Sequence, residues 1–337
     1  MTTPRIATRD PTLQAVVVER RPLFYSDGAD PALDRPAQVR AGSSIARVPG
    51  GIALVQDDAN FIAIVQPDAR RVHAIPLPAG AEGRRQFDDR RGNKTHKLDL
   101  EACVAVDTDE GTILLAFGSG STAARERVAL VRGWESNDPR VTLIHAPRFY
   151  DTLRRDHAFA GSELNVEGAV HLGDRLRLLG RGNGAPRAEV RPINATCDLE
   201  WPALLAHLRA ADRTPPPVPA NIITYELGTL GGLALSFTDA ASARGAVLYT
   251  AAAEDSPDAT RDGRVAGSAI GIIDETGAVR WTPLTETEGQ PFDGKVEGLV
   301  FSDRVDDELL VVVDADDPDA ASELCRVQLR GHWATPT

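Results

Sequence analysis

Three glutamates stand at equivalent positions of one short sequence pattern. Glu101, Glu167 and Glu297 each lie at the start of an apolar stretch, and each is followed by a small residue. A second stretch rich in Leu, Ile or Val then follows in each case. Because a repeated pattern puts its members at equivalent points of one structure, the sequence predicts that these three carboxylates meet. Carboxylates that meet repel one another unless a cation or bound protons offset their charge.

The spacing of the pattern indicates five units. Glu101 and Glu167 are 66 residues apart, and Glu167 and Glu297 are 130 residues apart, close to twice that distance. A copy without its acid is therefore expected near residue 231, in Leu230-Gly231-Gly232-Leu233, and an earlier copy has Ser43 in the position of the acid. The units are expected at residues 42–78, 98–147, 164–212, 229–285 and 295–330.

The units predict an all-β fold. Each contains short β-prone runs separated by Gly, Pro or Asp, which is typical of a five-bladed β-propeller with four antiparallel strands per blade, here as a single domain. The last unit lacks a fourth run, so residues 13–19 are expected to pair with residues 323–329 and close the ring. Residues 149–157 and 198–211 have apolar residues at helical spacing and are expected to form short helices.

A divalent cation on the propeller axis is the first prediction for the glutamates. The first strand of each blade lines the central channel, and calcium accepts six to eight oxygen ligands. Where a unit lacks the acid, the carbonyl of Ser43 or Ser44 and that of Leu230 or Gly231 are expected to contribute instead. Residues two positions before the acid, such as Asp99 and Asn165, face the same way along a strand. The alternative is a water-filled channel in which the glutamates pair with Lys295, Arg181 or Lys97.

The order of the units also resembles a known family. The series Ser, Glu, Glu, Gly, Glu, with Lys295-Val296-Glu297-Gly298 near the end, resembles the calcium-dependent apyrase nucleotidases. The pair Asp57-Asp58 at the end of the first unit's second strand resembles the same family. This resemblance implies a five-bladed propeller with a central calcium, and hydrolysis of nucleoside di- and triphosphates. The Glu-Gly strand starts are similar, more weakly, to esterase-like phytase and gluconolactonase propellers.

Further polar residues are expected at the mouth of the channel. Asp57 and Asp58 are expected to act in catalysis together with Arg181, whose guanidinium can bind two oxygens of an anion at once. A basic run between the first two units and the ends of other second strands are expected to bind an anionic small molecule, phosphorylated or carboxylated. The expected substrate-binding residues are Arg90, Arg91, Asn93, Lys94, Lys97, Ser119, Asn183 and Asp314.

Composition excludes several other classes of protein. The chain has 37 Lys and Arg against 49 Asp and Glu, and the net charge of −12 argues against nucleic acid or an anionic membrane as a partner. The histidines show no zinc spacing, and no phosphate-binding loop of the Walker type or dinucleotide fingerprint occurs. Three widely spaced cysteines indicate reduced thiols, so we expect a cytoplasmic protein, and we expect a monomer.

Two classes of function remain open. In the first, the cation polarises a substrate oxygen or activates water, and the protein is a calcium-dependent phosphohydrolase or an esterase- or lactonase-like hydrolase. In the second, the propeller is not catalytic: its central metal is structural, or its channel is filled with water, and it binds a ligand or a protein. Fold alone does not decide between them.

Overall fold

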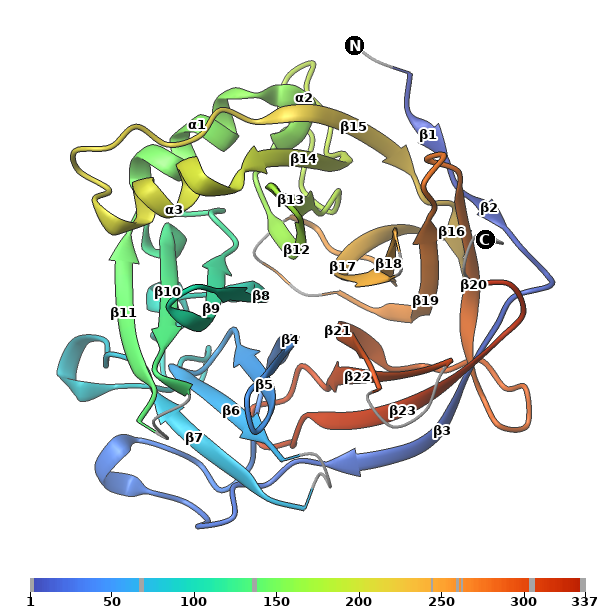
Figure 1. Ribbon diagram of the computed structural model, residues 1–337. Coiled ribbons are helices and arrows are strands. Elements are labelled where there is room, and N and C mark those ends of the chain that lie inside the picture. Colours follow the sequence, from blue (N-terminus) through green and yellow to red (C-terminus); the bar gives the residue numbers. More distant parts are fainter. Residues whose placement is uncertain are drawn as a thin grey trace.

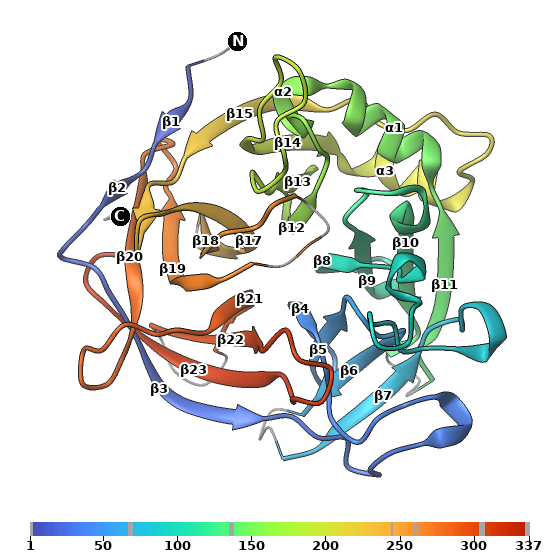
Figure 2. The same cartoon turned by 180° about the vertical axis from the view of Figure 1, so that it is seen from behind.

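The computed structural model describes residues 3–66, 70–134, 138–243, 245–258, 261, 263–302 and 307–333. Most of these residues form β-strands that stand around a central axis, as Figure 1 and the reverse view in Figure 2 show. The all-β prediction is confirmed, and the arrangement is that of a β-propeller. No helix in the described part of the chain is long and apolar enough to cross a membrane.

Separate antiparallel sheets form the first part of the ring. The first contains β4 (Gly42–Val48), β5 (Gly51–Gln56), β6 (Phe61–Val65) and β7 (Val72–Pro76). The second contains β8 (Leu100–Thr108), β9 (Gly111–Gly118), β10 (Arg127–Arg132) and β11 (Arg140–His145). The third contains β12 (Val166–Leu172), β13 (Arg175–Gly180), β14 (Asn194–Glu200) and β15 (Ala220–Glu226), with β1 (Arg5–Ile6) parallel to β15.

The other strands of the described chain are hydrogen-bonded into one long sheet. It begins with β16 (Thr229–Leu230), β17 (Leu233–Ala243), β18 (Ala246–Glu254), β19 (Val265–Ile273) and β20 (Val279–Glu286), and β2 (Thr8–Arg9) lies beside β20. It continues with β3 (Gln14–Pro22), β23 (Glu323–Arg330), β22 (Glu308–Asp314) and β21 (Lys295–Phe301). Neighbours pair antiparallel except that β20 pairs in parallel with both β2 and β3. The long sheet therefore joins two antiparallel groups where β20 meets β3.

The N-terminal strand completes the ring. β3 pairs antiparallel with β23, from Gln14 opposite Arg330 to Pro22 opposite Glu323, so the blue and red ends of the chain run side by side in Figure 1. Leu13, Ala15 and Val17 are at most 2% exposed. The predicted pairing of the N-terminal run with the last strand is confirmed, and it covers an edge that would otherwise be open to other chains.

The innermost strands form a closed circle around the axis. They contact one another in the order β4, β8, β12, β17, β21 and back to β4. The contact is close: a Cβ added to Gly298 would lie 3.0 Å from the backbone nitrogen of Ile45, and one added to Gly168 would lie 3.2 Å from that of Ala240. The small residue after Glu167 and Glu297 is therefore required by the approach of the neighbouring strand's backbone.

Helices lie at the outer edge of the ring, away from the axis (Figure 1). The helices expected around residues 149–157 and 198–211 are present as α1 (Pro147–Arg155) and α3 (Trp201–Arg209), and α2 (His157–Ala160) follows α1. Buried Phe149, Tyr150 and Leu153 join α1 to the core of the second and third sheets. Short 3-10 turns are η1 (Pro31–Leu33), η2 (Ala81–Gly83), η3 (Lys94–His96) and η4 (Ala123–Arg125).

Candidate functional site

A narrow polar pocket lies on the axis where the innermost strands begin. Its volume is about 40 Å³, which is enough for an ion or a few water molecules. Seven carboxyl groups and five basic groups line it among the described residues. The lining residues are Ala41, Gly42, Ser43, Asp57, Lys97, Asp99, Glu101, Arg125, Asn165, Glu167, Arg181, Asn183, Arg261, Lys295, Glu297, Asp314 and Asp316. We call this the axial pocket.

Each innermost strand has a β-bulge, and in four of the strands the bulged residue lines this pocket. The pairing register shifts around Ser43 in β4, Glu101 in β8, Glu167 in β12, Thr238 in β17 and Glu297 in β21. A bulge leaves one residue unpaired and redirects its side chain, which explains why bulges occur beside functional sites. The structure thus brings Glu101, Glu167 and Glu297, with Ser43, to one pocket.

The fourth copy of the pattern was placed wrongly. Leu230 and Gly231 lie in the hairpin of the short strand β16, and neither lines the axial pocket. The equivalent residue is Thr238, whose hydroxyl donates to the carbonyl of Val296 at 2.7 Å. The error arises because β16 adds residues before β17, so the repeat is longer here than the average period. Ser44 was also expected in the pocket but does not line it. Its side chain is fully buried, and its hydroxyl donates to Asp239 Oδ2 at 3.1 Å.

Lys97 occupies one side of the pocket. Its Nζ lies 2.5 Å from Asp57 Oδ2, 2.8 Å from Asp58 Oδ1 and 2.8 Å from Asp99 Oδ1. Arg125 Nη1 lies 2.9 Å from Asp99 Oδ2, so Asp99 is held between two cations. Lys97 was expected to bind an anionic substrate, but its ammonium is surrounded by carboxylates of the chain itself.

Arg181 and Lys295 occupy the other side. Arg181 donates to Glu254 Oε2 at 2.5 Å and to Glu167 Oε1 at 3.4 Å. Lys295 Nζ lies 2.9 Å from Glu297 Oε1 and 3.5 Å from Asp316 Oδ1. Arg181 is buried, so its guanidinium acts as the counter-ion of these glutamates. Glu254 and Asp316 were predicted to lie at the ends of second strands beside the channel mouth, without a role, whereas Arg125 was not predicted.

Some carboxylate oxygens in the pocket have no partner. Glu101 makes no hydrogen bond or ion pair with any described residue, and Glu297 Oε2 is buried without a hydrogen-bond partner. Oxygens of Asp57, Asp99 and Glu101 lie within 4.8 Å of one another. Two oxygens bound to one calcium at 2.3–2.6 Å lie at most about 5 Å apart, so this trio fits around a single ion.

The backbone before two of these strands is strained. Ala41 precedes β4 with φ of 51°, and Asp99 precedes β8 with φ of 56°. Such left-handed values cost a residue other than glycine on the order of 1–3 kcal/mol, and they gather at functional sites. Both residues line the axial pocket. The strain therefore marks the same place as the unpartnered carboxylates.

The pKa values show that negative charge is in excess. Burial raises the pKa of Glu167 to about 8, although Arg181 opposes the shift, and burial with Asp316 raises the pKa of Asp314 to about 7. Burial and the nearby Asp99 and Asp57 hold the pKa of Glu101 well above its usual range. The cations of the chain are therefore too few to keep all of these acids ionised at neutral pH.

These shifts predict that stability falls as the pH rises from 5 to 8 in metal-free buffer. In that range the unfolded chain has released the protons of Glu167 and Asp314, whereas the folded chain keeps that of Asp314 up to about pH 7 and that of Glu167 up to about pH 8. Raising the pH therefore favours unfolding by up to about 1.4 kcal/mol per pH unit for each group that still binds its proton. Urea unfolding at pH 5, 6, 7 and 8 measures the slope. Glu167→Gln should flatten it and the exposed Glu189→Gln should not; equal slopes in both variants would contradict the prediction.

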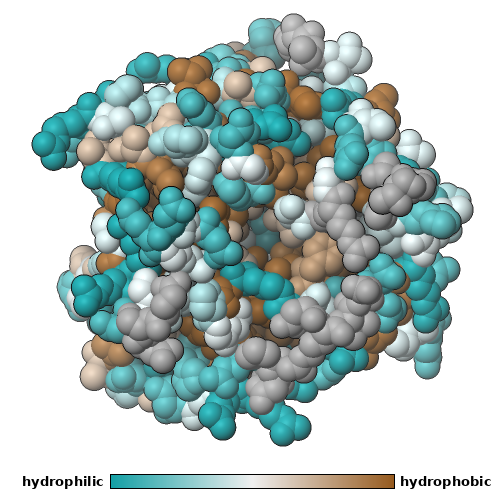
Figure 3. Space-filling model, viewed as in Figure 1, coloured by the Kyte–Doolittle hydropathy of each residue, from teal (hydrophilic) through white to brown (hydrophobic). Residues whose placement is uncertain are grey.

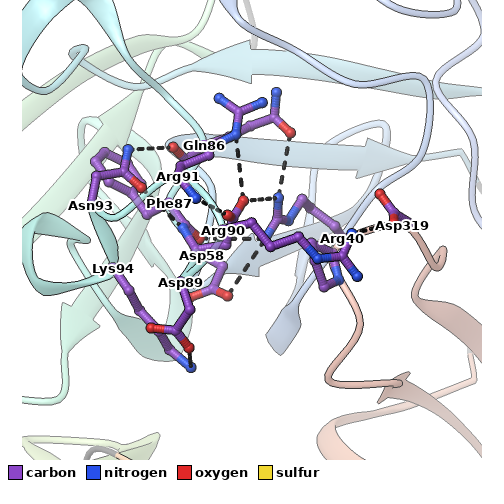
Figure 4. A network of polar contacts seen from close by, with 12 residues as sticks. Arg40, Asp58, Gln86, Phe87, Asp89, Arg90, Arg91, Asn93, Lys94 and Asp319 are labelled. Atoms are coloured by element: carbon purple, nitrogen blue, oxygen red, sulfur yellow. Dashed lines mark hydrogen bonds and ion pairs between the residues drawn. The ribbon is translucent and has the colours of Figure 1, made fainter.

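The basic run expected to bind an anion is engaged in ion pairs, as Figure 4 shows. Arg90 pairs with Asp319, Arg91 Nη1 lies 3.0 Å from Asp34 Oδ1, and Lys94 Nζ lies 3.8 Å from Asp89 Oδ2. Asn93 donates to the carbonyl of Gln86 at 3.0 Å. Arg90 and Lys94 line a second pocket of about 190 Å³ that adjoins the axial pocket, and Asp57, Asp58, Asp88, Asp89, Asp314, Asp316 and Asp317 line it too. The mouth is therefore acidic overall.

Two other residues expected to bind substrate, Asn183 and Ser119, differ in their position relative to the axial pocket. Asn183 lines the axial pocket and accepts a hydrogen bond from Asn165 Nδ2 at 3.3 Å. Ser119 is fully buried, and its hydroxyl lies 2.9 Å from that of Ser121, behind the pocket wall. Asn183 can therefore reach a ligand in the pocket, whereas Ser119 supports the loop after β9.

Comparison with known proteins gives a family. Residues 38–329 match the model of DUF6929, described as a family of unknown function. The chain belongs to this family. No curated protein matches its sequence.

Solved structures show a likeness of fold. A GH43 β-1,3-galactosidase superposes with a TM-score of 0.50 at 8% identity, over 91% of this chain and 59% of that one. Glutaminyl cyclase from Myxococcus xanthus matches with a TM-score of 0.46 at 10% identity, over 98% and 99% of the two chains. Arabinanase from Bacillus subtilis matches with a TM-score of 0.41 at 11% identity, over 86% of this chain and 94% of that one. None of these is an apyrase, so that part of the resemblance stays a prediction.

Proposed function

We propose that the chain is a five-bladed propeller whose axial pocket binds a divalent cation, with calcium as the expected ion. The blade count is supported by the circle of innermost strands β4, β8, β12, β17 and β21. Each begins an antiparallel group of four, the last completed by β3. A single domain over residues 1–337 and a monomeric state belong to the same proposal.

One observation carries the cation proposal. Oxygens of Asp57, Asp99 and Glu101 lie within 4.8 Å of one another, and Glu101 has no partner of its own among the described residues. Hard divalent cations prefer carboxylate oxygens. Glu167 and Glu297 would add negative charge, and Ser43 a hydroxyl or carbonyl oxygen. Leu230 and Gly231 are no longer part of the site.

The size of the pocket supports an ion more than an organic substrate. A volume of about 40 Å³ has room for an ion and its remaining water, but not for a sugar or a nucleotide. When bound, such a cation would supply Lewis-acid activation to a molecule held at the mouth. Asp57 lines both pockets and Asp58 lines the outer one, so both could contact such a molecule.

Hydrolysis of an anionic substrate has less support. The cations expected to receive the anion, Arg90, Arg91, Lys97 and Arg181, all pair with carboxylates, and the mouth is acidic. A propeller with a bound metal and a ligand-binding face accounts better for these contacts. The cytoplasmic location and the lack of nucleic-acid and membrane partners stay predictions.

Calorimetric titration of the full chain with CaCl2 tests the proposal. We expect one site, and a rise in melting temperature with calcium, since a ligand bound only by the folded state stabilises it. Glu101→Gln should weaken binding by roughly tenfold or more, because it removes one charged ligand. Glu189→Gln, an exposed glutamate, is the matched control.

The absence of calcium binding would contradict the proposal. Neither heat of binding nor a shift in melting temperature at millimolar calcium would show that the excess acids are offset by protons alone. MgCl2 in the same titration gives the selectivity, and weaker binding than that of calcium is expected because magnesium demands stricter geometry.

A further inference from the structure

A second cavity lies at the opposite end of the axis. Its volume is about 530 Å³, and the later halves of the same innermost strands line it. Figure 3 shows this face, with a hollow at its centre and hydrophobic residues, coloured brown, around the hollow. Volumes of about 300–1,000 Å³ are those of pockets for small organic molecules. We call this the apolar cavity.

A hydrogen-bonded floor separates the two ends of the axis. Ser44 in β4 donates to Asp239 Oδ2 in β17 at 3.1 Å, and the same oxygen accepts from the backbone nitrogen of Leu299 in β21 at 3.1 Å. The backbone nitrogen of Cys103 in β8 donates to Ser44 Oγ at 3.0 Å. Ser44 and Asp239 are at most 1% exposed. The apolar cavity is therefore a site of its own and does not depend on the cation proposal.

Apolar residues of every innermost strand line the cavity, with polar residues between them. Each innermost strand contributes aliphatic residues or alanines, and Phe301 adds an aromatic ring. The apolar lining residues are Ile45, Ala46, Val104, Ala105, Val106, Ala169, Val170, Ala240, Ala241, Leu299, Val300 and Phe301. Apolar surface of a ligand that is buried against these residues leaves water, which is favourable.

Few charged groups among the described residues lie at the rim of the cavity. Among the described residues that line the cavity, Arg47 is the one cation and Asp107 the one carboxylate. Arg47 donates through Nε to the carbonyl of Phe301 at 2.8 Å. Burial lowers the pKa of His171, also at the rim, which favours the neutral imidazole. Among the described residues the rim therefore carries one charge of each sign, in contrast to the acidic mouth at the other end.

We propose that the apolar cavity binds one small, uncharged, ring-containing organic molecule. Its ring lies among the aliphatic walls and against Phe301, and any hydroxyl or carbonyl group stays at the rim near Ser242. A charged ligand is disfavoured, because it would lose water without gaining a net counter-charge. The concave shape, closed by the floor of Ser44 and Asp239, fits a small molecule.

Fluorescence titration with N-phenyl-1-naphthylamine tests this proposal. The probe is uncharged and becomes fluorescent in apolar sites, and we expect saturation at one molecule per chain. Ala105→Phe and Ala241→Phe place a ring in the cavity and should each weaken binding at least tenfold. Ala79→Phe, on an exposed loop, is the control and should bind like the unaltered protein.

A second measurement needs no substitution. Photolysis of benzophenone with the unaltered protein should label peptides that contain residues 103–107 or 299–301. Saturable binding that the cavity variants weaken, with labelling of these peptides, supports the proposal. Binding that does not saturate, several equal sites, unchanged affinity in folded Ala105→Phe and Ala241→Phe, or labelling only elsewhere would overturn it.

Discussion

Replacing Arg181 by Met is expected to lower the free energy of unfolding by about 3–5 kcal/mol, the usual cost of removing one partner of a buried ion pair. Arg181 Nη2 lies 2.5 Å from Glu254 Oε2, and Nη1 lies 3.4 Å from Glu167 Oε1. All three side chains are at most 5% exposed. Without the guanidinium, the buried carboxyls of Glu167 and Glu254 lose their shared cation in a pocket that already has too many acids, and Glu254 keeps Lys295, whose Nζ lies 3.6 Å from its Oε2.

The matched control is an exposed arginine of the same region. Arg187 pairs with Glu163 at 2.5 Å, but its side chain is 70% exposed, so Arg187→Met should cost less than about 1 kcal/mol. Urea unfolding at pH 7 measures both variants. Adding Glu254→Gln to Arg181→Met should restore part of the loss, because it removes the buried carboxylate that faced the guanidinium.

The alternative outcome has a definite meaning. If Arg181→Met is as stable as Arg187→Met, the axial carboxylates do not need this guanidinium, and Arg181 is available to an external anion as the sequence suggested. Calcium should also stabilise Arg181→Met more than the unaltered protein, since the cation then offsets charge that the arginine no longer neutralises.

Removing residues 1–22 is expected to leave no stably folded protein. The truncation deletes β3, which carries Ala15 and Val17 at most 2% exposed, and it uncovers β23 and β20. Leu13, 1% exposed, is lost with them. Burial of each fully buried Val or Leu contributes about 1.5–3 kcal/mol. Together with the lost strand pairing, this approaches the whole stability of a domain, about 5–15 kcal/mol.

Soluble yield, circular dichroism and thermal unfolding measure this loss. A chain that lacks only residues 1–4 keeps β1, β2 and β3 and is the control, which should melt like the full protein. A synthetic peptide of residues 11–24 added to the truncated chain should restore folding in part, because it supplies the missing strand. An unchanged melting temperature after the full truncation would show that β3 does not hold the ring together.

The local sequence was enough to predict the strands and the meeting of the three glutamates on the axis. The alternation of apolar runs and turn residues is a property of the chain itself, so the all-β fold and the pairing of residues 13–19 with the last strand could be predicted. Glu101, Glu167 and Glu297 follow from the same repeat, because a β-bulge at one position of each innermost strand turns the same residue toward the axis. The small residue after them was visible too, and the close approach of the strands explains it.

The position of the fourth copy of the pattern was predicted wrongly because of a local feature of the chain. Leu230-Gly231-Gly232-Leu233 imitates the pattern and lies at the average period, but it forms the turn between β16 and β17. Thr238 and Asp239 carry the true position. The polar pair Thr238-Asp239 within an apolar strand, with Thr238 71 residues after Glu167, could have indicated the correct position. An average period does not predict an added hairpin.

By itself, the sequence determined which groups could do chemistry on the axis, whereas the tertiary structure alone decided which of them are already neutralised. Arg181 reaches Glu254 across 73 residues of sequence, and Lys97 reaches Asp57 across 40. No local pattern announces such pairs, because they depend on how neighbouring sheets pack around the axis. The same packing leaves the Glu101 carboxylate without a partner among the described residues, and it forms a cavity at the far end of the axis from residues that the sequence indicates only as strand core. The sequence gives the type of each side chain, but whether a charged side chain can bind a ligand depends on which distant groups share its low-dielectric surroundings.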